Sequence, residues 1–360
     1  MPEQNKSSSQ TLINLLDQTS KINPSATALL HNKERISYGT LQKRVYNLAS
    51  QLEKLGIKKE DRIGIWLPNI PEWIEVFFAS AHLGAIAVSI NTRFGTTEVA
   101  DILNRSGCKA LFIFSNPGDD KYLSKLSQVD ENSRTALETV ITIGKPSGEG
   151  KDLEKIQLIP YAKLTQSSSP LSLSTTITPS SKCIMFTTSG TTSLPKLVVH
   201  NQNGIASHAK DIAKTLKLDI PSAVILQAIP FCGVFGFSQA MAAISSGASI
   251  LCLPSFDARS TIDLIKEHNV THLNGSDEMF DRLIHESTSI TDFTSVAFCG
   301  YANFTPSLTD IVHTSEEFGL ALVGLYGTSE LLAFLAIKRP ELPASQRRRM
   351  GCLLYTSDAA

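Results

Sequence analysis

Hydroxyl groups, a glycine and a lysine are concentrated in one short segment between two apolar runs. Residues 186–200 read FTTSGTTSLPKLVVH, with neither the spacing of an amphipathic helix nor the alternation of a half-buried strand, so we expect a loop. The Ser and Thr hydroxyls, the backbone N–H groups around Gly190 and the ammonium group of Lys196 are all hydrogen-bond donors. Such a set of donors favours an anion, most naturally the phosphates of a nucleotide.

A P-loop uses the same residue types at a different spacing. Its pattern is G-x-x-x-x-G-K-[ST], whereas Lys196 is preceded by Pro195 and followed by Leu197, which excludes a P-loop NTPase. A polar surface loop without function is the other interpretation. With each residue type at a frequency of about one in twenty, six fixed positions coincide by chance in such a chain roughly five times in a million. The six positions are Ser189, Gly190, Thr191, Thr192, Pro195 and Lys196.

A second motif, YGTSE, lies downstream at 326–330. TTSGTTSLPK followed by this YGTSE box resembles the adenylate-forming superfamily, which includes acyl-CoA synthetases, the adenylation domains of peptide synthetases and firefly-type luciferases. The similarity extends from about Ile36 to Met350 and includes the segments NTRF, AIPFCGVFGF and FCGYANFTP. Two motifs in the order of the family indicate membership more strongly than either motif alone.

The resemblance implies both a fold and a reaction. The fold is α/β, with two helix-covered β-sheets in a layered αβαβα large domain. The reaction joins a carboxylic acid to ATP, giving an acyl-adenylate and pyrophosphate with Mg²⁺ as cofactor, and CoA then accepts the acyl group as a thioester. We therefore expect an AMP-forming acyl-CoA synthetase for a fatty or aromatic acid. The alternatives are a peptide-synthetase-type adenylation domain and a nucleotide- or acyl-binding protein without turnover.

The resemblance also implies roles for single residues of the nucleotide site. Lys196 and Glu330 would be catalytic, and Glu330 would bind Mg²⁺, for which a hard oxygen ligand is suitable. An acid at the solvated N-terminus of a helix is the other interpretation of Glu330. Tyr326 would stack on adenine and Ser329 would contact the α-phosphate. The remaining predicted nucleotide-binding residues are Thr188, Ser189, Gly190, Thr191, Thr192, Gly300, Tyr301, Ala302 and Gly327.

The same likeness places Gly233, Phe235 and Gly236 beside an acyl pocket. The chain departs from the family at several positions, and these departures concern the identity of the acid more than the nucleotide site. Gly233 stands where many members have His. Ser193 and Leu197 stand where Gly is common in the phosphate-binding loop, and Tyr301 and Asn303 replace a Gly and a Pro of the adenine-contacting loop.

Asp277 and Glu278 occupy positions where relatives tend to have an uncharged turn lining the acyl pocket. If both carboxylates face inward, the substrate carries a cationic or hydrogen-bond-donating group. A helix cap, with Ser276 followed by acids in the first turn, explains the two residues equally well.

Alternating patterns of strand and helix surround the motifs, which indicates a largely parallel sheet covered by helices. Residues 116–182 are less regular, and the Ser/Thr/Pro-rich run at 167–181 is predicted to be a loop or linker. Helices are expected at 37–56, 71–83 and 96–107. Strands are expected at 61–68, 85–90, 109–114, 183–187, 223–229, 248–254, 270–274, 295–300 and 322–327.

We expect residues 1–351 to form a truncated large domain. One sheet-forming half would comprise roughly 70–215, and the other 25–69 together with 220–340. Residues 352–360 resemble a translated cloning sequence and are expected not to belong to the natural gene. The resemblance implies a further small carboxy-terminal domain with a catalytic Lys, so we expect slow adenylation, or none, from the chain as given.

The composition of the chain indicates which classes of binding partner and which cellular compartment to expect. The 33 basic and 34 acidic residues give a net charge of −1, so we expect no nucleic-acid partner. The N-terminus lacks the apolar core of a signal peptide, and the most apolar segment, 76–90, is interpreted as a buried helix running into a strand, so we expect no membrane span. Six Cys without a CxxC pair suggest reduced, packed thiols and a cytoplasmic protein. Oligomeric state is left open.

Overall fold

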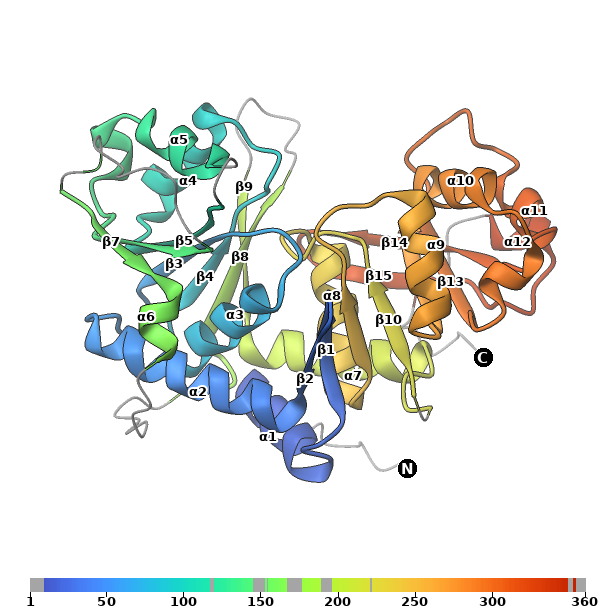
Figure 1. Ribbon diagram of the computed structural model, residues 1–360, viewed down its shortest axis with the longest axis horizontal. Coiled ribbons are helices and arrows are strands. Elements are labelled where there is room, and N and C mark those ends of the chain that lie inside the picture. Colours follow the sequence, from blue (N-terminus) through green and yellow to red (C-terminus); the bar gives the residue numbers. More distant parts are fainter. Residues whose placement is uncertain are drawn as a thin grey trace, which may run out of the picture. The chain divides into compact units, whose positions relative to one another are not determined.

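The computed structural model describes residues 10–116, 120–144, 153, 155–166, 177–188, 196–220, 222–348 and 352–353. Two β-sheets, each flanked by helices, confirm the expected α/β class (Figure 1). The chain divides into two compact units. The first unit is Met1–Ser25 with Ser37–His208, and the second is Ala26–Ile36 with Ala209–Ala360, so that the division falls within α7 (Gln202–Thr215).

The first unit is built on a seven-stranded sheet with the order β7-β6-β5-β3-β4-β8-β9. Every neighbouring pair is parallel except β8 with β9, which is antiparallel. The predicted strands of this region are confirmed, whereas β6 and β7 lie in the stretch whose pattern was irregular. The strands are β3 (Arg62–Trp66), β4 (Ile86–Ser89), β5 (Ala110–Phe114), β6 (Thr139–Ile143), β7 (Gln157–Pro160), β8 (Lys182–Thr188) and β9 (Lys196–Asn201).

Helices cover this sheet on both faces. Apolar residues of α4 (Thr96–Ser106) and α5 (Lys121–Ser127) join the sheet in one buried cluster. Helix α3 (Pro71–Leu83) packs on β3 and β4 and also contacts α1 (Leu12–Ile22) and α2 (Tyr38–Lys54), while α6 (Tyr161–Thr165) contacts β6 and β7. Because α3 contacts the sheet as well as α1 and α2, it is buried along almost its whole length, as expected for the apolar segment that runs into β4.

The second unit is built on a nine-stranded sheet with the order β16-β15-β14-β13-β12-β10-β11-β1-β2. Strands β1, β11, β10, β12, β13 and β14 run parallel, and β14, β15 and β16 pair antiparallel. The strands are β1 (Thr27–His31), β2 (Glu34–Ser37), β10 (Val224–Gln227), β11 (Ser249–Cys252), β12 (His272–Ser276), β13 (Phe298–Ala302), β14 (Leu322–Thr328), β15 (Leu332–Ile337) and β16 (Cys352–Leu353).

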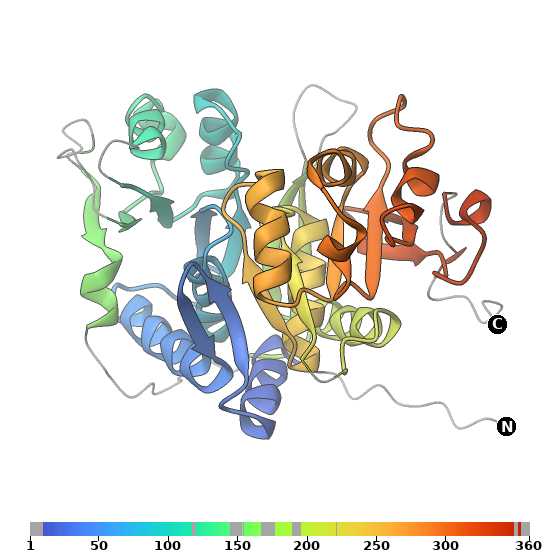
Figure 2. The same cartoon turned by 45° about the vertical axis from the view of Figure 1, so that its right-hand side comes forward.

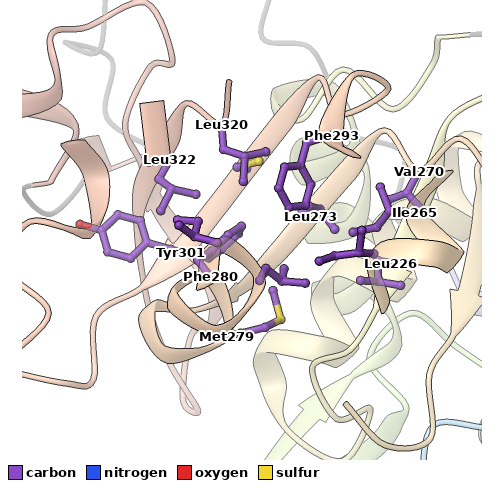
Figure 3. Packing of buried hydrophobic residues seen from close by; sticks show 14 of the residues in the cluster. Leu226, Ile265, Val270, Leu273, Met279, Phe280, Phe293, Tyr301, Leu320 and Leu322 are labelled. Carbon is purple, nitrogen blue, oxygen red and sulfur yellow. The ribbon is translucent and has the colours of Figure 1, made fainter. Parts of the chain in front are cut away.

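One face of this second sheet carries the core in Figure 3, where Leu226, Leu273 and Leu322 of the strands meet Ile265 and Phe280 of the helices. The helices on this face are α9 (Ala258–Glu267), α10 (Asp277–Glu286), α11 (Ile311–Glu316) and α12 (Ala344–Arg347). Helix α8 (Val234–Ser246) contacts β10, β11 and β15. It covers the opposite face, because side chains alternate along a strand and Gln227, next to Leu226, bonds to a glutamine of α8.

The predicted division into halves was wrong for residues 37–69. Strand β3 pairs with β4 and β5 in the first sheet, whereas only β1 and β2, the dark-blue pair in Figure 2, join the second sheet. Strand β1 does so by pairing in parallel with β11, with Leu29 opposite Ile250. Neighbouring segments can join different sheets because pairing depends on partners that are distant in the chain, which a local pattern does not report.

Five of the cysteines, Cys108, Cys183, Cys232, Cys252 and Cys299, are buried thiols, as expected. Burial raises the pKa of the Cys108 thiol to about 11, so this side chain stays protonated and acts as a small apolar group. None of the described helices combines the length and the apolar content that crossing a membrane requires.

Candidate active site

The prediction of a loop over 186–200 was wrong at both ends, which belong to the antiparallel strands β8 (Lys182–Thr188) and β9 (Lys196–Asn201). The hydroxyl-rich residues between Thr188 and Lys196 connect these two strands in the chain. Thr188, the last residue of β8, lies directly opposite the exposed Lys196, the first residue of β9. The structure therefore brings together the two ends of the predicted phosphate-binding motif, although they are eight positions apart in the chain. The residues between them, including Ser189, Gly190, Thr191, Thr192 and Ser193, lie outside the described part of the chain.

Leu197 belongs to β9 and pairs with Thr187 in the same ladder. A leucine fits this position because a strand residue needs no glycine flexibility. The departure from the family's common Gly at this position is thus accommodated by regular strand structure.

The YGTSE box forms the end of β14 and the turn into β15. The Leu331 N–H donates to the Thr328 carbonyl oxygen at 3.3 Å and to the Thr328 hydroxyl at 3.3 Å, and Ser329 and Glu330 lie in the turn that these bonds close. Because a strand follows rather than a helix, the interpretation of Glu330 as a helix N-terminal acid was wrong. Its carboxylate is exposed.

Tyr326 and Gly327 have distinct positions in this hairpin. The pairing register shifts between Tyr326 and Thr328, and such an irregularity re-aims side chains. The Tyr326 side chain is 38% exposed and so presents an aromatic surface to solvent. A Cβ on Gly327 would lie 2.5 Å from the Ala333 Cα, so the close approach of the two strands requires glycine here.

The predicted adenine-contacting residues Gly300, Tyr301 and Ala302 are the last three of β13. The Tyr301 ring is not available to a nucleotide. It lies in the core cluster with 2% exposure (Figure 3), and its hydroxyl donates to the Arg348 carbonyl oxygen at 3.4 Å. Burial, followed by the nearby charge of Asp277, raises the pKa of Tyr301. Only the backbone of Tyr301 is therefore available for the predicted contact with adenine.

Gly300 lies against Asn274 of β12, its partner in the strand register. A Cβ on Gly300 would lie 2.4 Å from Asn274 Oδ1, so this position too has room only for glycine unless the amide moves. Both polar atoms of the Asn274 amide are buried and have no hydrogen-bond partner among the described residues.

Asp277 has a different role from the one that the pocket hypothesis required. Ser276 caps α10, accepting the Met279 N–H at 3.1 Å, which confirms the predicted helix cap, and Glu278 is exposed. The Asp277 carboxylate is completely buried and accepts hydrogen bonds from the backbone of Phe304 and Thr305. It is therefore engaged by the turn after β13 and does not stand as an unpaired anion facing an acyl group.

The predicted acyl-pocket segment begins α8. Gly233 is the N-cap residue, and the Phe235 ring contacts the Phe334 ring of β15 edge-on, with centroids 5.2 Å apart. A Cβ on Gly236 would lie 2.3 Å from the Pro230 carbonyl oxygen, so the chain folds back tightly at this point.

Two buried glutamines that were not predicted from the sequence hold this segment in place. Gln227 Nε2 donates to the carbonyl oxygens of Ile229 at 2.6 Å and Gly236 at 3.1 Å. Gln239 Nε2 in turn donates to Gln227 Oε1 at 2.9 Å. The sequence signal for Gln227 was its place inside the apolar run AVILQAI, because a polar side chain that is buried in such a run needs hydrogen-bond partners.

The described candidates fall into two groups. Thr188 and Lys196 belong to the first unit, whereas the residues from Gly233 to Glu330 belong to the second. Within the second unit, Ser276 pairs with Ala302 at the carboxyl ends of β12 and β13. This edge of a parallel sheet is where α/β folds bind ligands.

Glu330 remains the candidate magnesium ligand. Among the residues that the structure describes, no three His, Cys, Asp or Glu side chains gather to hold a metal. Mg²⁺ in nucleotide sites keeps several waters and takes one or two carboxylates with substrate phosphates. A single exposed carboxylate on a turn fits that donor set.

A family model described as AMP-binding enzyme matches residues 16–358. The chain belongs to this AMP-binding enzyme family. The match includes all the predicted site residues of this AMP-binding chain, and it also extends over most of the segment 352–360.

Curated relatives of the AMP-binding chain are acyl-CoA ligases. The 2-methylpropanoate–CoA ligase CCL4 of Humulus lupulus is 26% identical, covering 97% of this chain and 63% of the relative. The mitochondrial medium-chain acyl-CoA ligase ACSF2 of Rattus norvegicus is 27% identical, covering 80% and 50%. The peroxisomal trans-cinnamate:CoA ligase of Petunia hybrida is 26% identical, covering 89% and 57%. The chain thus spans less than two thirds of the length of each.

Solved structures confirm the fold of the large domain of adenylate-forming enzymes. The anthranilate CoA ligase AuaEII in complex with anthranoyl-AMP has a TM-score of 0.81 at 19% identity, covering 92% of this chain and 62% of that one. The o-succinylbenzoate CoA synthetase MenE of Bacillus subtilis in complex with OSB-AMP has a TM-score of 0.76 at 21%, covering 96% and 82%. The inhibitor-bound N-terminal domain of FACL13 from Mycobacterium tuberculosis has a TM-score of 0.73 at 21%, covering 89% and 76%.

Proposed function

We propose that the chain supplies the nucleotide- and acid-binding part of an AMP-forming acyl-CoA synthetase. The observation that carries the proposal is the pairing of Thr188 with Lys196 across the β8–β9 hairpin in a chain of the AMP-binding family. The hairpin places a hydroxyl-bearing residue and a cationic residue at the two ends of a donor-rich connection. The acyl-CoA ligases among its relatives support the same reaction.

In this proposal, an oxygen of the substrate carboxylate attacks the α-phosphorus of ATP while the bond from that phosphorus to the bridging oxygen of pyrophosphate breaks. The substrate brings its own nucleophile, so the protein needs chiefly to align the groups and neutralise charge. Lys196 and the hydroxyl-rich connection would bind the β- and γ-phosphates, and Ser329 would contact the α-phosphate. Glu330 would hold Mg²⁺, which supplies further charge neutralisation on the phosphates.

The acid is proposed to be aliphatic or aromatic, and CoA is proposed as the acyl acceptor. The named relatives act on 2-methylpropanoate, medium-chain acids and cinnamate, which span both classes of acid. Thioester formation would follow when the CoA thiolate attacks the acyl carbon of the adenylate and AMP leaves with the bonding electron pair.

Two measurements test the proposal. Acid-dependent ATP–pyrophosphate exchange, with a panel of aliphatic and aromatic acids, tests adenylation. Calorimetric titration with ATP and with AMP tests the phosphate-binding role, because AMP lacks the β- and γ-phosphates. We expect Lys196→Ala to weaken ATP binding about 10- to 100-fold, the worth of one charge-assisted hydrogen bond, and to leave AMP binding unchanged.

Lys182 offers a matched control. It is an exposed lysine at the other end of the same hairpin, opposite Asn201, and Lys182→Ala should leave both affinities unchanged. An equal loss of ATP and AMP affinity in Lys196→Ala would contradict the phosphate-binding role. Because slow exchange, or none, is expected from the chain as given, the exchange assay also uses the chain joined to a small carboxy-terminal domain of the family. ATP binding without acid-dependent exchange in that completed protein would favour a nucleotide-binding protein without turnover.

A further inference from the structure

The Asp277 carboxylate accepts four hydrogen bonds from the protein. Its Oδ2 accepts the backbone N–H groups of Phe304 at 3.0 Å and Thr305 at 2.7 Å. Its Oδ1 accepts the Thr305 hydroxyl at 3.3 Å and the backbone N–H of Glu278 at 2.9 Å. Three of the four donors thus belong to the turn that leaves β13.

The strand register explains why this carboxylate meets this turn. Strand β12 ends at Ser276 and β13 ends at Ala302, and these two residues pair. Asp277 therefore begins α10 at the level where β13 leaves the sheet and its amides lose their strand partners. Two successive backbone N–H groups that converge on one anion form a stable arrangement, and here the anion is a side chain of the same unit.

Other residues of this turn are exposed to solvent. Asn303 and Phe304 are exposed, and the Phe304 side chain is 73% exposed despite its apolar ring. The Asp277 side chain, in contrast, is 0% exposed. A buried carboxylate strongly disfavours any turn conformation that removes its donors, because an uncompensated buried charge is costly. Asp277 therefore stabilises the conformation in which the Phe304 and Thr305 amides point at its carboxylate.

We propose that Asp277 is a positioning residue of the nucleotide site. By fixing the turn 303–305, it holds the end of β13, and hence the backbone of Gly300, Tyr301 and Ala302, in place for the purine ring. The backbone of this segment is the part that can contact the purine, because the Tyr301 ring is packed in the hydrophobic core. The inference rests on the proposed function and assigns Asp277 to the nucleotide rather than to the choice of acid.

AMP is a suitable probe, because its affinity does not depend on Lys196 in the proposed site. Calorimetric titration of the 360-residue chain with AMP would compare the wild type with Asp277→Ala and Asp277→Asn, and urea unfolding would report the stability of each. We expect Asp277→Ala to weaken AMP binding about tenfold or more. Asp277→Asn should weaken it about threefold, because the amide keeps one acceptor oxygen for the turn.

Asp292 provides the matched control. It is also buried, and it accepts the Ser287 hydroxyl at 2.9 Å, the Thr288 N–H at 3.2 Å and the Lys266 ammonium at 3.1 Å, in the segment around the short helix Ile290–Phe293. Asp292→Ala should lower stability without changing AMP affinity. An equal loss of AMP affinity in Asp292→Ala would show a general effect of stability and would overturn the positioning role.

The results of these titrations distinguish a failure of the proposed function from a failure of the positioning role of Asp277. Absence of AMP binding by the wild type overturns the proposed function and this inference with it. Binding by the wild type with unchanged affinity in Asp277→Ala overturns only the inference. Should Asp277→Ala fail to fold, hydrogen exchange of the Phe304 and Thr305 amides in Asp277→Asn decides. Unchanged protection there, together with unchanged AMP affinity, overturns the role of Asp277.

Discussion

Gly233 and Gly236 lie three residues apart at the start of α8 but have different surroundings. A Cβ on Gly233 would meet the Pro230 carbonyl oxygen at 3.8 Å, which is ordinary contact. A Cβ on Gly236 would lie 2.3 Å from the same oxygen and 2.5 Å from the Ile229 carbonyl oxygen. Both of these oxygens are backbone atoms, and Gln227 holds the Ile229 oxygen in place.

We predict that Gly236→Ala lowers the free energy of unfolding by about 1–3 kcal/mol, because the overpacked backbone must shift. Gly233→Ala should change it by less than about 1 kcal/mol. Urea unfolding of the two variants at 25 °C measures the difference. Equal effects of the two substitutions would mean that the chain does not fold back against Gly236 as described.

At the scale of elements, three helices of the first unit meet at one buried acid. Glu75 of α3 is 1% exposed and pairs with Arg44 of α2, with 3.2 Å between Arg44 Nη1 and Glu75 Oε1. The hydroxyl of Tyr161, in α6, donates to Glu75 Oε2. Burial, followed by the charge of Glu75, raises the pKa of Tyr161 well above its usual value, so the hydroxyl remains a donor. The acid thus ties α2 and α6 to α3.

Glu75→Ala should lower the free energy of unfolding by about 2–3 kcal/mol, because it removes the acceptor of the partly buried Tyr161 hydroxyl and one partner of the Arg44 guanidinium, which is 38% exposed. Tyr161→Phe should cost about 1 kcal/mol, because it removes the donor of one hydrogen bond while Glu75 keeps Arg44 as a partner. In a double-mutant cycle the two changes should couple by about 1 kcal/mol. Strict additivity of the two would contradict a direct bond between α3 and α6.

At the scale of the whole molecule, each unit contains a buried histidine whose pKa is lowered. Burial lowers the pKa of His82 in the first unit, and the charge of Asp17 only partly opposes this effect. Both ring nitrogens of His82 have no partner among the described residues. Burial likewise lowers the pKa of His272 in the second unit, partly opposed by its bond to the Leu216 carbonyl oxygen.

The lowered pKa values of His82 and His272 determine how the stability of the protein changes with pH. An unfolded histidine titrates near pH 6.5, so below that pH the unfolded chain binds more protons than the folded one and stability falls. We predict full stability above about pH 7.5 and a loss on acidification to pH 5.5, at most about 1.4 kcal/mol per pH unit for each histidine. Urea unfolding across this range measures it.

His82→Phe should make the loss on acidification smaller, because phenylalanine does not titrate and can keep the ring contact with Tyr46, whose centroid lies 4.7 Å away. His285→Gln, which replaces an exposed histidine, serves as the control substitution. A wild type and a His82→Phe variant that lose equal stability between pH 7.5 and 5.5 would exclude His82 as a source of the effect.

Much of the fold was predictable because the patterns that specify it are local. Helix 71–83 and strands such as 109–114 followed from the spacing of apolar residues, and the structure confirms them. Strands β12 and β13 begin later in the chain than the predicted 270–274 and 295–300, because pairing rather than hydrophobicity sets their ends. Helix α1 and strand β15 were missed altogether.

By itself, the sequence determined the chemical types: a donor-rich segment ending in Lys196, a YGTSE box and alternating α/β elements, all encoded by residues close together in the chain. Only the tertiary structure decided that Thr188 faces Lys196, that the Tyr301 ring lies in the core and that the Asp277 carboxylate holds residues 304 and 305. The physical reason is that strand register and burial depend on partners distant in the chain, and a short pattern contains no information about them.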